Sequence, residues 1–575
     1  MKGNPSQFLH RSGLRQNIPA WVLLVVVAWG SNLEARETVT FNCDVAPILF
    51  QNCSTCHRPG LSAPFSLLSY ADARKHSAEI VDVTQRRYMP PWLPDADCGH
   101  FIGERVLNPE AIATFKKWVE GGLEEGRPAD LPALPQWADG WQLGPPDLVV
   151  TMPQPYLLAA EGKDVYRNFV IPIPLQQRRF IRGVEFHPGN QRVVHHGFIQ
   201  IDSTRKSRGL AAGETPPSFP GMELPETALM PGGQMLGWQP GKVPYFSPDG
   251  LSWVLNPGSD VVLQLHLHPS GKPEPVQSSI GFYFTDRPPT NSAFRLELVR
   301  FDLDIPPAST NYVVEHAYTL PIDVQLVGIS PHTHYLGKDL SGYAILPKGE
   351  RKCLIHIPDW DFNWQGDYRF VDPVLLPKGT SLHMRYQFDN STGNPRNPSH
   401  PPRRVQYGLQ TTDEMAELWF QLLPIRPSEG PILGRDYTAF RRRFMVEYYE
   451  GRLRANAKDG LAHLKLASAY QFLGRAEEAF DHFTTAAGLL PDDARAHYEL
   501  GYQYLMRNRF TEATPELEIA VRLDPKDHQA FGCLGISQMG ERKLDQAEKN
   551  LEKALQLNPD DTLARQYLDR LKATR

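Results

Sequence analysis

The last third of the chain repeats itself every 34 residues, and this period constrains the fold more than any other feature. Prolines recur in the segments Leu-Leu-Pro491-Asp, Leu-Asp-Pro525-Lys and Leu-Asn-Pro559-Asp. Small residues follow the same period, at Ala479, Ala513 and Ala547 and at Ala467, Gly501 and Gly535. Such a period is typical of stacked helix pairs, with small residues at close contacts and proline ending each unit. We therefore predict an α-solenoid over residues 440–575.

This region resembles the tetratricopeptide repeat family over about residues 459–560, with a capping helix from Asp561 to Lys572. The resemblance implies a concave surface for a protein partner, with a scaffold or oligomerisation role as the alternative. Cys533 lies beside Leu534 in an expected helix, which predicts a buried thiol. Repeats of this kind carry no chemistry of their own, so any activity has to come from the rest of the chain.

Length and composition limit what that remainder can be. A chain of 575 residues exceeds one hydrophobic core, and 41% apolar with 22% charged residues excludes wholesale disorder and a polytopic membrane protein. A net charge of −5 gives no sign of a nucleic-acid partner. Lys2, Arg11 and Arg15 precede an apolar run from Ala20 to Trp29, which predicts a signal peptide over residues 1–36. We expect an exported protein, periplasmic or secreted and of bacterial type; an uncleaved anchor is the alternative, and only then would the chain meet a membrane.

The mature chain opens with Cys53-Ser54-Thr55-Cys56-His57, a CxxCH motif typical of c-type haem attachment. Both thiols bond to the haem and His57 binds its iron. Met89 is the expected sixth ligand, with His76 and His100 as alternatives. Residues 37–126 resemble the small, all-α cytochrome c domains of exported multidomain proteins, and the Pro-rich residues 127–146 form a linker. Two further cysteines in this domain, Cys43 and Cys98, predict a disulfide.

Short alternating apolar runs between residues 147 and 428 predict antiparallel β-sandwiches. Three histidine pairs lie within them: His195-His196, His266-Leu267-His268 and His332-Thr333-His334. Residues i and i+2 share one face of a strand, so the last two pairs can each present two imidazoles to one ion. Val261, Leu263, Leu265 and Leu267 form the opposite, core face. His195 and His196 diverge on a regular strand, so joint ligation requires a bulge or a strand end.

The middle of the chain is similar to the copper type II, ascorbate-dependent monooxygenases, which include peptidylglycine and dopamine hydroxylases. The resemblance covers about residues 145–425 and rests on four segments: Val194-His195-His196, Leu263-Gln264-Leu265-His266, the run from His332 to Lys338, and Asp413-Glu414-Met415. It implies two sandwiches, over residues 147–290 and 291–428, and two copper ions. His195, His196 and His266 would hold one ion. His332, His334 and Met415 would hold the other, where O₂ and the substrate C–H bond react. His268 has no family role, which favours an indirect or surface position.

Two departures from the family's pattern disfavour peptidylglycine as the substrate. Ser330 replaces the arginine by which peptide-amidating members bind a carboxylate, and Trp419 replaces a tyrosine. The sequence therefore predicts a copper-dependent monooxygenase acting on a small molecule or peptide, with electrons relayed by the fused haem; an external reductant such as ascorbate is compatible with it. The alternative is a non-catalytic copper- and haem-binding or sensing protein whose repeats recruit partners.

Overall fold

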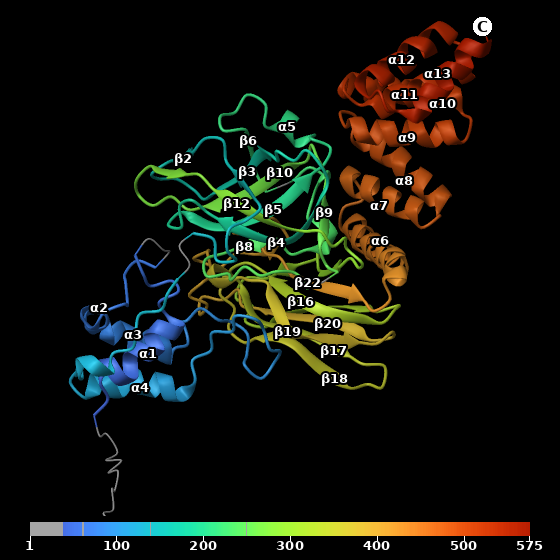
Figure 1. Cartoon of the computed structure of the whole chain (residues 1–575). Helices are drawn as coiled ribbons and strands as arrows, with labels where there is room; N and C mark the ends of the chain where they lie inside the picture. The colour runs from blue at the N-terminus through green and yellow to red at the C-terminus, as the bar shows by residue number, and fades with distance from the viewer. Residues whose placement is uncertain (1–37, 60–62, 138–139, 223, 249, 575) are drawn as a thin grey trace, which may run out of the picture.

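The structure, a computed structural model, describes residues 38–574 except 60–62, 138–139, 223 and 249. The predicted signal peptide lies outside the described residues. Figure 1 shows short helices near the N-terminus, two β-rich units side by side, and a helical arm that ends at the C-terminus. The β-rich middle and the helical C-terminal region therefore agree with prediction. Among the described helices, none has the length and apolar character needed to cross a membrane.

The N-terminal part consists of short helices around one apolar cluster. They are η1 (Phe41–Val45), α1 (Ala46–Asn52), α2 (Tyr70–Lys75), α3 (Ser77–Gln85) and α4 (Pro109–Glu120). Asn108 caps α4, because its side chain accepts a hydrogen bond from a backbone N–H of the first turn at 2.7 Å. Leu49 of α1 and Phe115 and Trp118 of α4 are buried together. The first and last helices of this region thus share a core.

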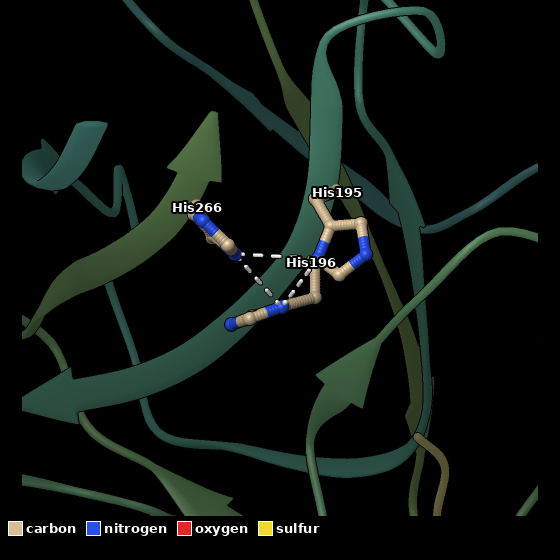
Figure 2. Close-up of side chains that lie close together, drawn as sticks. All are labelled: His195, His196 and His266. Carbon is tan, nitrogen blue, oxygen red and sulfur yellow. Dashed lines mark hydrogen bonds between the residues drawn. The ribbon is translucent and has the colours of Figure 1, made fainter. Parts of the chain in front are cut away.

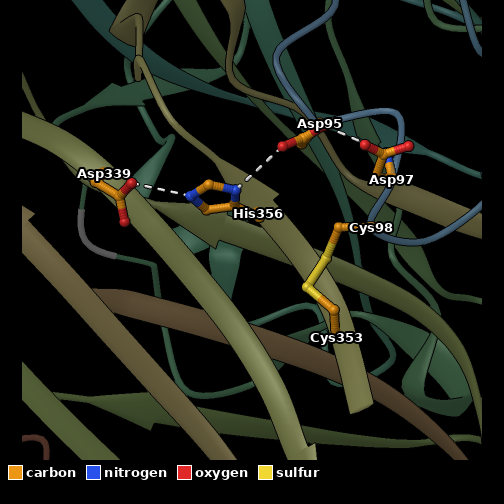
Figure 3. Close-up of a disulfide and its surroundings, with 6 residues drawn as sticks. All are labelled: Asp95, Asp97, Cys98, Asp339, Cys353 and His356. Carbon is orange, nitrogen blue, oxygen red and sulfur yellow. Dashed lines mark hydrogen bonds and ion pairs between the residues drawn. A yellow bond between two sulfur atoms is a disulfide. The ribbon is translucent and has the colours of Figure 1, made fainter. Parts of the chain in front are cut away.

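Residues 92–102 leave these helices and lie against the second β-rich unit. The backbone N–H of Ile102 donates to the carbonyl of Arg369 at 2.8 Å. A disulfide joins Cys98 to Cys353 of β18 (Arg351–Ile357), with Cα atoms 5.5 Å apart (Figure 3). Cys43 is an exposed free thiol. The predicted Cys43–Cys98 disulfide is therefore wrong, because this segment carries Cys98 away from the helices to a sheet 255 residues further along the chain.

The Pro-rich linker is attached to the first β-rich unit at its C-terminal end. Near its start lies the short turn η2 (Pro128–Asp130). The backbone N–H groups of Gln142 and Leu143 donate to the carboxylate of Glu185 at 2.8 and 3.0 Å. Trp141 stacks on His187, with ring centroids 3.7 Å apart. The last residues of the linker are thus held in place.

The first β-rich unit has two main antiparallel sheets around one core. One sheet has the order β1 (Leu148–Thr151), β12 (Ser279–Thr285), β4 (Arg179–His187), β9 (Trp253–Leu255). The other has the order β6 (Ser218–Pro220), β3 (Val165–Pro172), β10 (Asp260–Leu267), β5 (Val194–Asp202), β7 (Ala228–Leu229), with β8 (Gly237–Trp238) beside β5. Smaller elements are β2 (Tyr156–Leu158), β11 (Glu274–Val276), α5 (Ser207–Leu210) and η3 (Pro231–Gly233). Val261, Leu263, Leu265 and Leu267 of β10 are completely buried in the core, as predicted.

The second unit repeats this two-layer plan around its own core. Its sheets have the orders β13 (Phe294–Val299), β22 (Glu417–Pro424), β16 (Val324–His332), β19 (Tyr368–Leu376), and β15 (Tyr312–Thr319), β20 (Ser381–Phe388), β17 (Gly337–Ile345), β18. Smaller elements are β14 (Asp304–Ile305), β21 (Val405–Gln406) and the turn η4 (Phe362–Trp364).

A single long helix joins this unit to the repeats. After the turn η5 (Pro427–Glu429), α6 (Gly430–Ala455) places Leu433 and Tyr437 in the core of the second β-rich unit and Val446 and Tyr449 in the core of the repeats. The boundary expected at residue 440 therefore falls inside α6. The helices that follow are α7 (Gly460–Phe472), α8 (Ala476–Leu489), α9 (Ala494–Met506), α10 (Phe510–Leu523), α11 (His528–Gly540), α12 (Leu544–Leu557) and α13 (Thr562–Thr574). Cys533 is buried among them, as predicted.

Candidate metal centres

The three histidines predicted to share one ion converge at one end of a sheet in the first β-rich unit. His195 and His196 lie at the start of β5, and His266 lies near the end of its neighbour β10. The register shifts here: His266 faces His196 and Leu267 faces Val194, so His195 is bulged out of the ladder. This is the bulge that joint ligation by two adjacent histidines requires.

The imidazoles turn their Nδ1 atoms toward one another (Figure 2). Nδ1 of His195 lies 3.2 Å from Nδ1 of both His196 and His266, and the remaining pair is 3.4 Å apart. Two nitrogens that bind one ion tetrahedrally at about 2.0 Å are themselves about 3.3 Å apart. Burial lowers the pKa of His195 to about 3 and also lowers the pKa values of His196 and His266. The rings are therefore neutral near pH 7, and their spacing fits a metal ion.

Asp164 orients this cluster from outside. One of its carboxylate oxygens lies 3.0 Å from Nε2 of His266, and the other lies 2.8 Å from Nδ1 of His268. Burial alone would raise the pKa of Asp164, but the hydrogen bonds from both histidines hold it well below its usual range. The carboxylate thus places a proton on Nε2 of His266 and leaves Nδ1 free to bind a metal. His268 contacts Asp164, which gives it a supporting position.

The second pair of histidines lies where β16 ends. The ring centroids of His332 and His334 are 5.3 Å apart. Nδ1 of His332 lies 2.7 Å from the side-chain oxygen of Gln365, and Nδ1 of His334 lies 3.1 Å from the carbonyl oxygen of Asp413. These oxygens hold a proton on each Nδ1 and leave Nε2 free for a metal. Burial, followed by the neighbouring His334, lowers the pKa of His332 to about 3.

Glu414 holds the His332–Leu336 segment in place through hydrogen bonds. Its carboxylate is completely buried and accepts hydrogen bonds from the Thr333 hydroxyl at 2.6 Å and from the Leu336 backbone N–H at 2.9 Å. It also accepts from the backbone N–H groups of His334 and Met415. One carboxylate therefore joins the histidine segment to the segment that carries the predicted methionine ligand.

The pairing of β16 with β22 indicates where Met415 lies. His332 faces Glu417 in this antiparallel ladder. The ladder ends at this pair: His334 lies two residues after β16, and Met415 lies two residues before β22. Met415 is 7% exposed. The structure thus brings the segments of all three predicted ligands together.

A cavity of about 420 Å³ lies between the two β-rich units and connects the two histidine clusters. His196 of the first cluster and His332 and His334 of the second all line it, whereas Met415 is not among its described lining residues. Ser330 and Trp419, the two positions that depart from the peptide-amidating enzymes, also line it. Its walls include the apolar side chains of Phe198, Met222, Met230, Met235 and Trp238. Its size and lining are those of a small-molecule site.

A second cavity, of about 480 Å³, surrounds the CxxCH motif. Cys53, Cys56, His57 and Met89 all line it. Both cysteines are free, and burial raises the pKa of Cys53 to about 12. Nδ1 of His57 lies 3.2 Å from the carbonyl oxygen of Phe65, which leaves Nε2 for an iron ligand.

The residues that line this cavity distinguish between the ligands predicted for the haem iron. The alternative ligands His76 and His100 are not among the described residues that line the cavity. His76 instead stacks on Phe65, with ring centroids 3.7 Å apart. The cavity is thus lined by two thiols, one imidazole and one thioether. This donor set fits a c-type haem.

The turn η4 separates the two cavities. Phe362 and Gln365 line the cavity between the β-rich units, while Asn363 and Trp364 line the CxxCH cavity. The ring of Phe362 is 6.4 Å from that of His195 and 5.6 Å from that of His334, measured between centroids. This buried aromatic ring therefore lies between the two histidine clusters.

Several residues of these sites were not predicted from the sequence. Asp164, Gln365 and Phe362 stand in no motif, and single acids, amides and aromatics carry no spacing that could have revealed them. Glu414 lies inside the quoted Asp413-Glu414-Met415 segment, yet only its buried position reveals what it holds.

Comparison with known proteins identifies only the C-terminal region. A tetratricopeptide repeat family model matches residues 464–528, which confirms the predicted repeats. Similar solved structures include MamA residues 41 to the end from Desulfovibrio magneticus RS-1, at 25% identity over 22% of this chain and 73% of that chain, with a TM-score of 0.22. The first TPR of Spaghetti (RPAP3) bound to the HSP90 peptide SRMEEVD has 22% identity over 21% of this chain and 94% of that chain, with a TM-score of 0.20. The Arabidopsis OM64 TPR domain has 19% identity over 20% of this chain and 94% of that chain, with a TM-score of 0.19. No curated protein matches the chain.

Proposed function

We propose that the β-rich middle binds two copper ions and that the chain is an exported copper-dependent monooxygenase. The observation that carries the proposal is the shared cavity: His196 of one cluster and His332 and His334 of the other line the same space of about 420 Å³. Imidazole ligands suit copper, and a thioether such as that of Met415 favours Cu(I). Copper at the second cluster would supply the O₂ chemistry that hydroxylates a C–H bond.

The chain's own residues would prepare this chemistry. Gln365 and the Asp413 carbonyl fix the orientation of His332 and His334, and Asp164 fixes that of His266. Hydroxylation with O₂ converts C–H to C–OH, consumes two electrons and two protons, and releases water. With copper bound, the two clusters would hold one-electron centres on either side of the Phe362 ring. The apolar, methionine-rich wall favours a substrate with an apolar body, a small molecule or a peptide.

We also propose that the N-terminal helices form a cytochrome c-like domain whose haem is bound covalently by Cys53 and Cys56, with His57 and Met89 as iron ligands. The haem would supply a one-electron store that relays electrons to copper. The geometry of the CxxCH cavity supports this, since the four predicted donors line it together. Export is supported by the Cys98–Cys353 disulfide, because such bonds persist in oxidising compartments.

Metal analysis of the purified chain tests the copper proposal. We expect two coppers per chain, and Met415→Ala should weaken Cu(I) binding at one site while sparing the other. Asp202→Asn, which alters a buried carboxylate at the far end of β5, is the matched control and should keep both coppers. A single copper in the natural chain, or two unaltered sites in the Met415 variant, would contradict the assignment.

A second candidate function is favoured by the repeat match: a non-catalytic copper- and haem-binding or sensing protein that recruits partners through its repeats. Tetratricopeptide repeats typically bind protein segments, so a protein partner is expected under both proposals. The reduced, copper-loaded protein separates them when it is exposed to O₂ with a pool of exported metabolites. Oxygen incorporation into a product favours the enzyme. Copper reoxidation with no oxygenated product favours the sensor.

A further inference from the structure

The CxxCH cavity is not built by the N-terminal helices alone. Cys53, His57 and Met89 line one side, while Arg192, His195 and His268 of the first β-rich unit line another. Residues of the unit that carries the three-histidine cluster therefore complete the cavity, together with Asn363 and Trp364 of the second unit. One wall comes from residues that lie more than 100 positions after Met89 in the chain.

His195 belongs to both sites at once. Its Nδ1 lies 3.2 Å from the Nδ1 atoms of His196 and His266, and its side chain also lines the CxxCH cavity. Adjacent side chains diverge on a regular strand, and the bulge at His195 lets the two Nδ1 atoms meet although the rings line different cavities. His196 lines the cavity between the β-rich units, and His195 lines the cavity on the other side. The cluster thus lies between the two cavities.

Several bonds hold the N-terminal part against the β-rich units. Beside the Cys98–Cys353 disulfide, the backbone N–H of Asp95 donates to the carbonyl of His356 at 2.7 Å. His356 also lies between the carboxylates of Asp95 and Asp339, at 3.4 and 2.9 Å (Figure 3). The guanidinium of Arg105 donates to the carbonyl of Gly241 in the first β-rich unit. The composite cavity is therefore a fixed feature of the full chain.

We propose that the CxxCH site and the three-histidine site form one thermodynamically coupled pair, with His195 as the shared wall; this rests on the proposed function, which places haem in one and a metal ion in the other. Ferric haem carries one more positive charge than ferrous haem. A divalent ion at the neighbouring cluster therefore disfavours the ferric state and raises the reduction potential of the haem. By linkage, the oxidation state of the haem changes metal affinity by the same factor.

Zn²⁺ is the probe, because it binds imidazole without exchanging electrons with haem. The full chain with covalently attached haem is titrated spectroelectrochemically, first metal-free and then with Zn²⁺. We expect Zn²⁺ to raise the haem potential and to bind the ferrous protein about tenfold more tightly than the ferric protein, equivalent to about 59 mV for one electron. Removing Zn²⁺ with a chelator should restore the original potential, a test that needs no variant.

His266→Ala and His332→Ala form the matched pair of variants. Neither residue is among the described residues that line the CxxCH cavity, so both substitutions spare its wall. His266→Ala should abolish the Zn²⁺-dependent shift, whereas His332→Ala should retain it. Absence of covalent haem or of metal binding overturns the proposed function and this inference with it. Haem and metal both bound without a shift in the natural chain, or a shift that persists in His266→Ala, overturns the coupling alone.

Discussion

The two histidine clusters are assembled in different ways, although both contribute residues to one cavity. In the first β-rich unit, all three imidazoles come from β5 and β10, which are hydrogen-bonded neighbours in one sheet. In the second unit, His332 ends a strand, His334 lies beyond it and Met415 precedes another strand. Sheet register thus positions the first cluster, whereas the second depends on a buried carboxylate that joins two loops. The first arrangement should tolerate local change better than the second.

The largest effect that separates the clusters is expected from Glu414→Gln. The amide cannot accept all the hydrogen bonds that the carboxylate receives, and its own N–H groups would face backbone donors. Buried unsatisfied donors should cost about 3 kcal/mol or more. We expect a lower urea midpoint for the β-rich region and loss of copper from the second site, with the first site retained.

Glu185→Gln is the control for this prediction. Glu185 is also buried and also accepts two backbone N–H groups, but these belong to the end of the linker. Its replacement should lower stability and leave both copper sites occupied. Equal copper loss in both variants would show that general destabilisation, and not the Glu414 contacts, governs the second site.

Sequence reasoning succeeded where a short-range rule applies. The 34-residue period predicted the helix pairs because each repeat packs on its neighbour. Strand geometry likewise predicted that joint ligation by His195 and His196 needs a bulge or a strand end, and the structure has a bulge there. It failed where contacts depend on tertiary packing. Cys98 pairs with a cysteine 255 residues away, so proximity in sequence favoured the wrong partner, Cys43. The domain boundary expected at residue 440 is a similar case. Helix α6 contributes residues to the cores on both sides of it, and no change in composition along the helix indicates this.

Loss of the disulfide is expected to have the next largest effect, because this bond ties the N-terminal part to the β-rich units, whose residues complete the CxxCH cavity. Cys353→Ser should lower stability by about 2–4 kcal/mol. Both copper sites should remain, but the Zn²⁺-dependent shift in haem potential should shrink as docking loosens. Cys43→Ser, at an exposed free thiol, is the control and should change neither. Peptide mapping without reductant checks the bond itself, and a Cys43–Cys98 peptide would contradict it.

Asp164→Asn probes the first cluster as Glu414→Gln probes the second. The side chain orients His266 without joining the cluster, and loss of such an orienting carboxylate typically weakens metal binding 10–100-fold. We expect this loss at the first site alone, with little change in the urea midpoint, since Asp164 is part-exposed. Competition with a chromophoric Cu(I) chelator measures it. An equal loss at the second site would mean that the clusters do not bind metal independently.

The smallest effect is expected from Phe362→Leu, which tests whether the clusters are separate at all. The ring is 3% exposed and lies between His195 and His334, so a smaller side chain removes packing contacts at the wall between the two cavities. Phe362 donates no ligand, and both clusters are held by other residues. We therefore expect a stability loss of roughly 1 kcal/mol and two copper sites whose affinities change less than threefold. Phe362→Tyr keeps the ring and should match the natural chain in copper affinity. If Phe362→Leu instead lowers copper affinity at both sites together, the ring supports both clusters. The contrast between a first cluster positioned by sheet register and a second positioned by the Glu414 carboxylate would then be wrong.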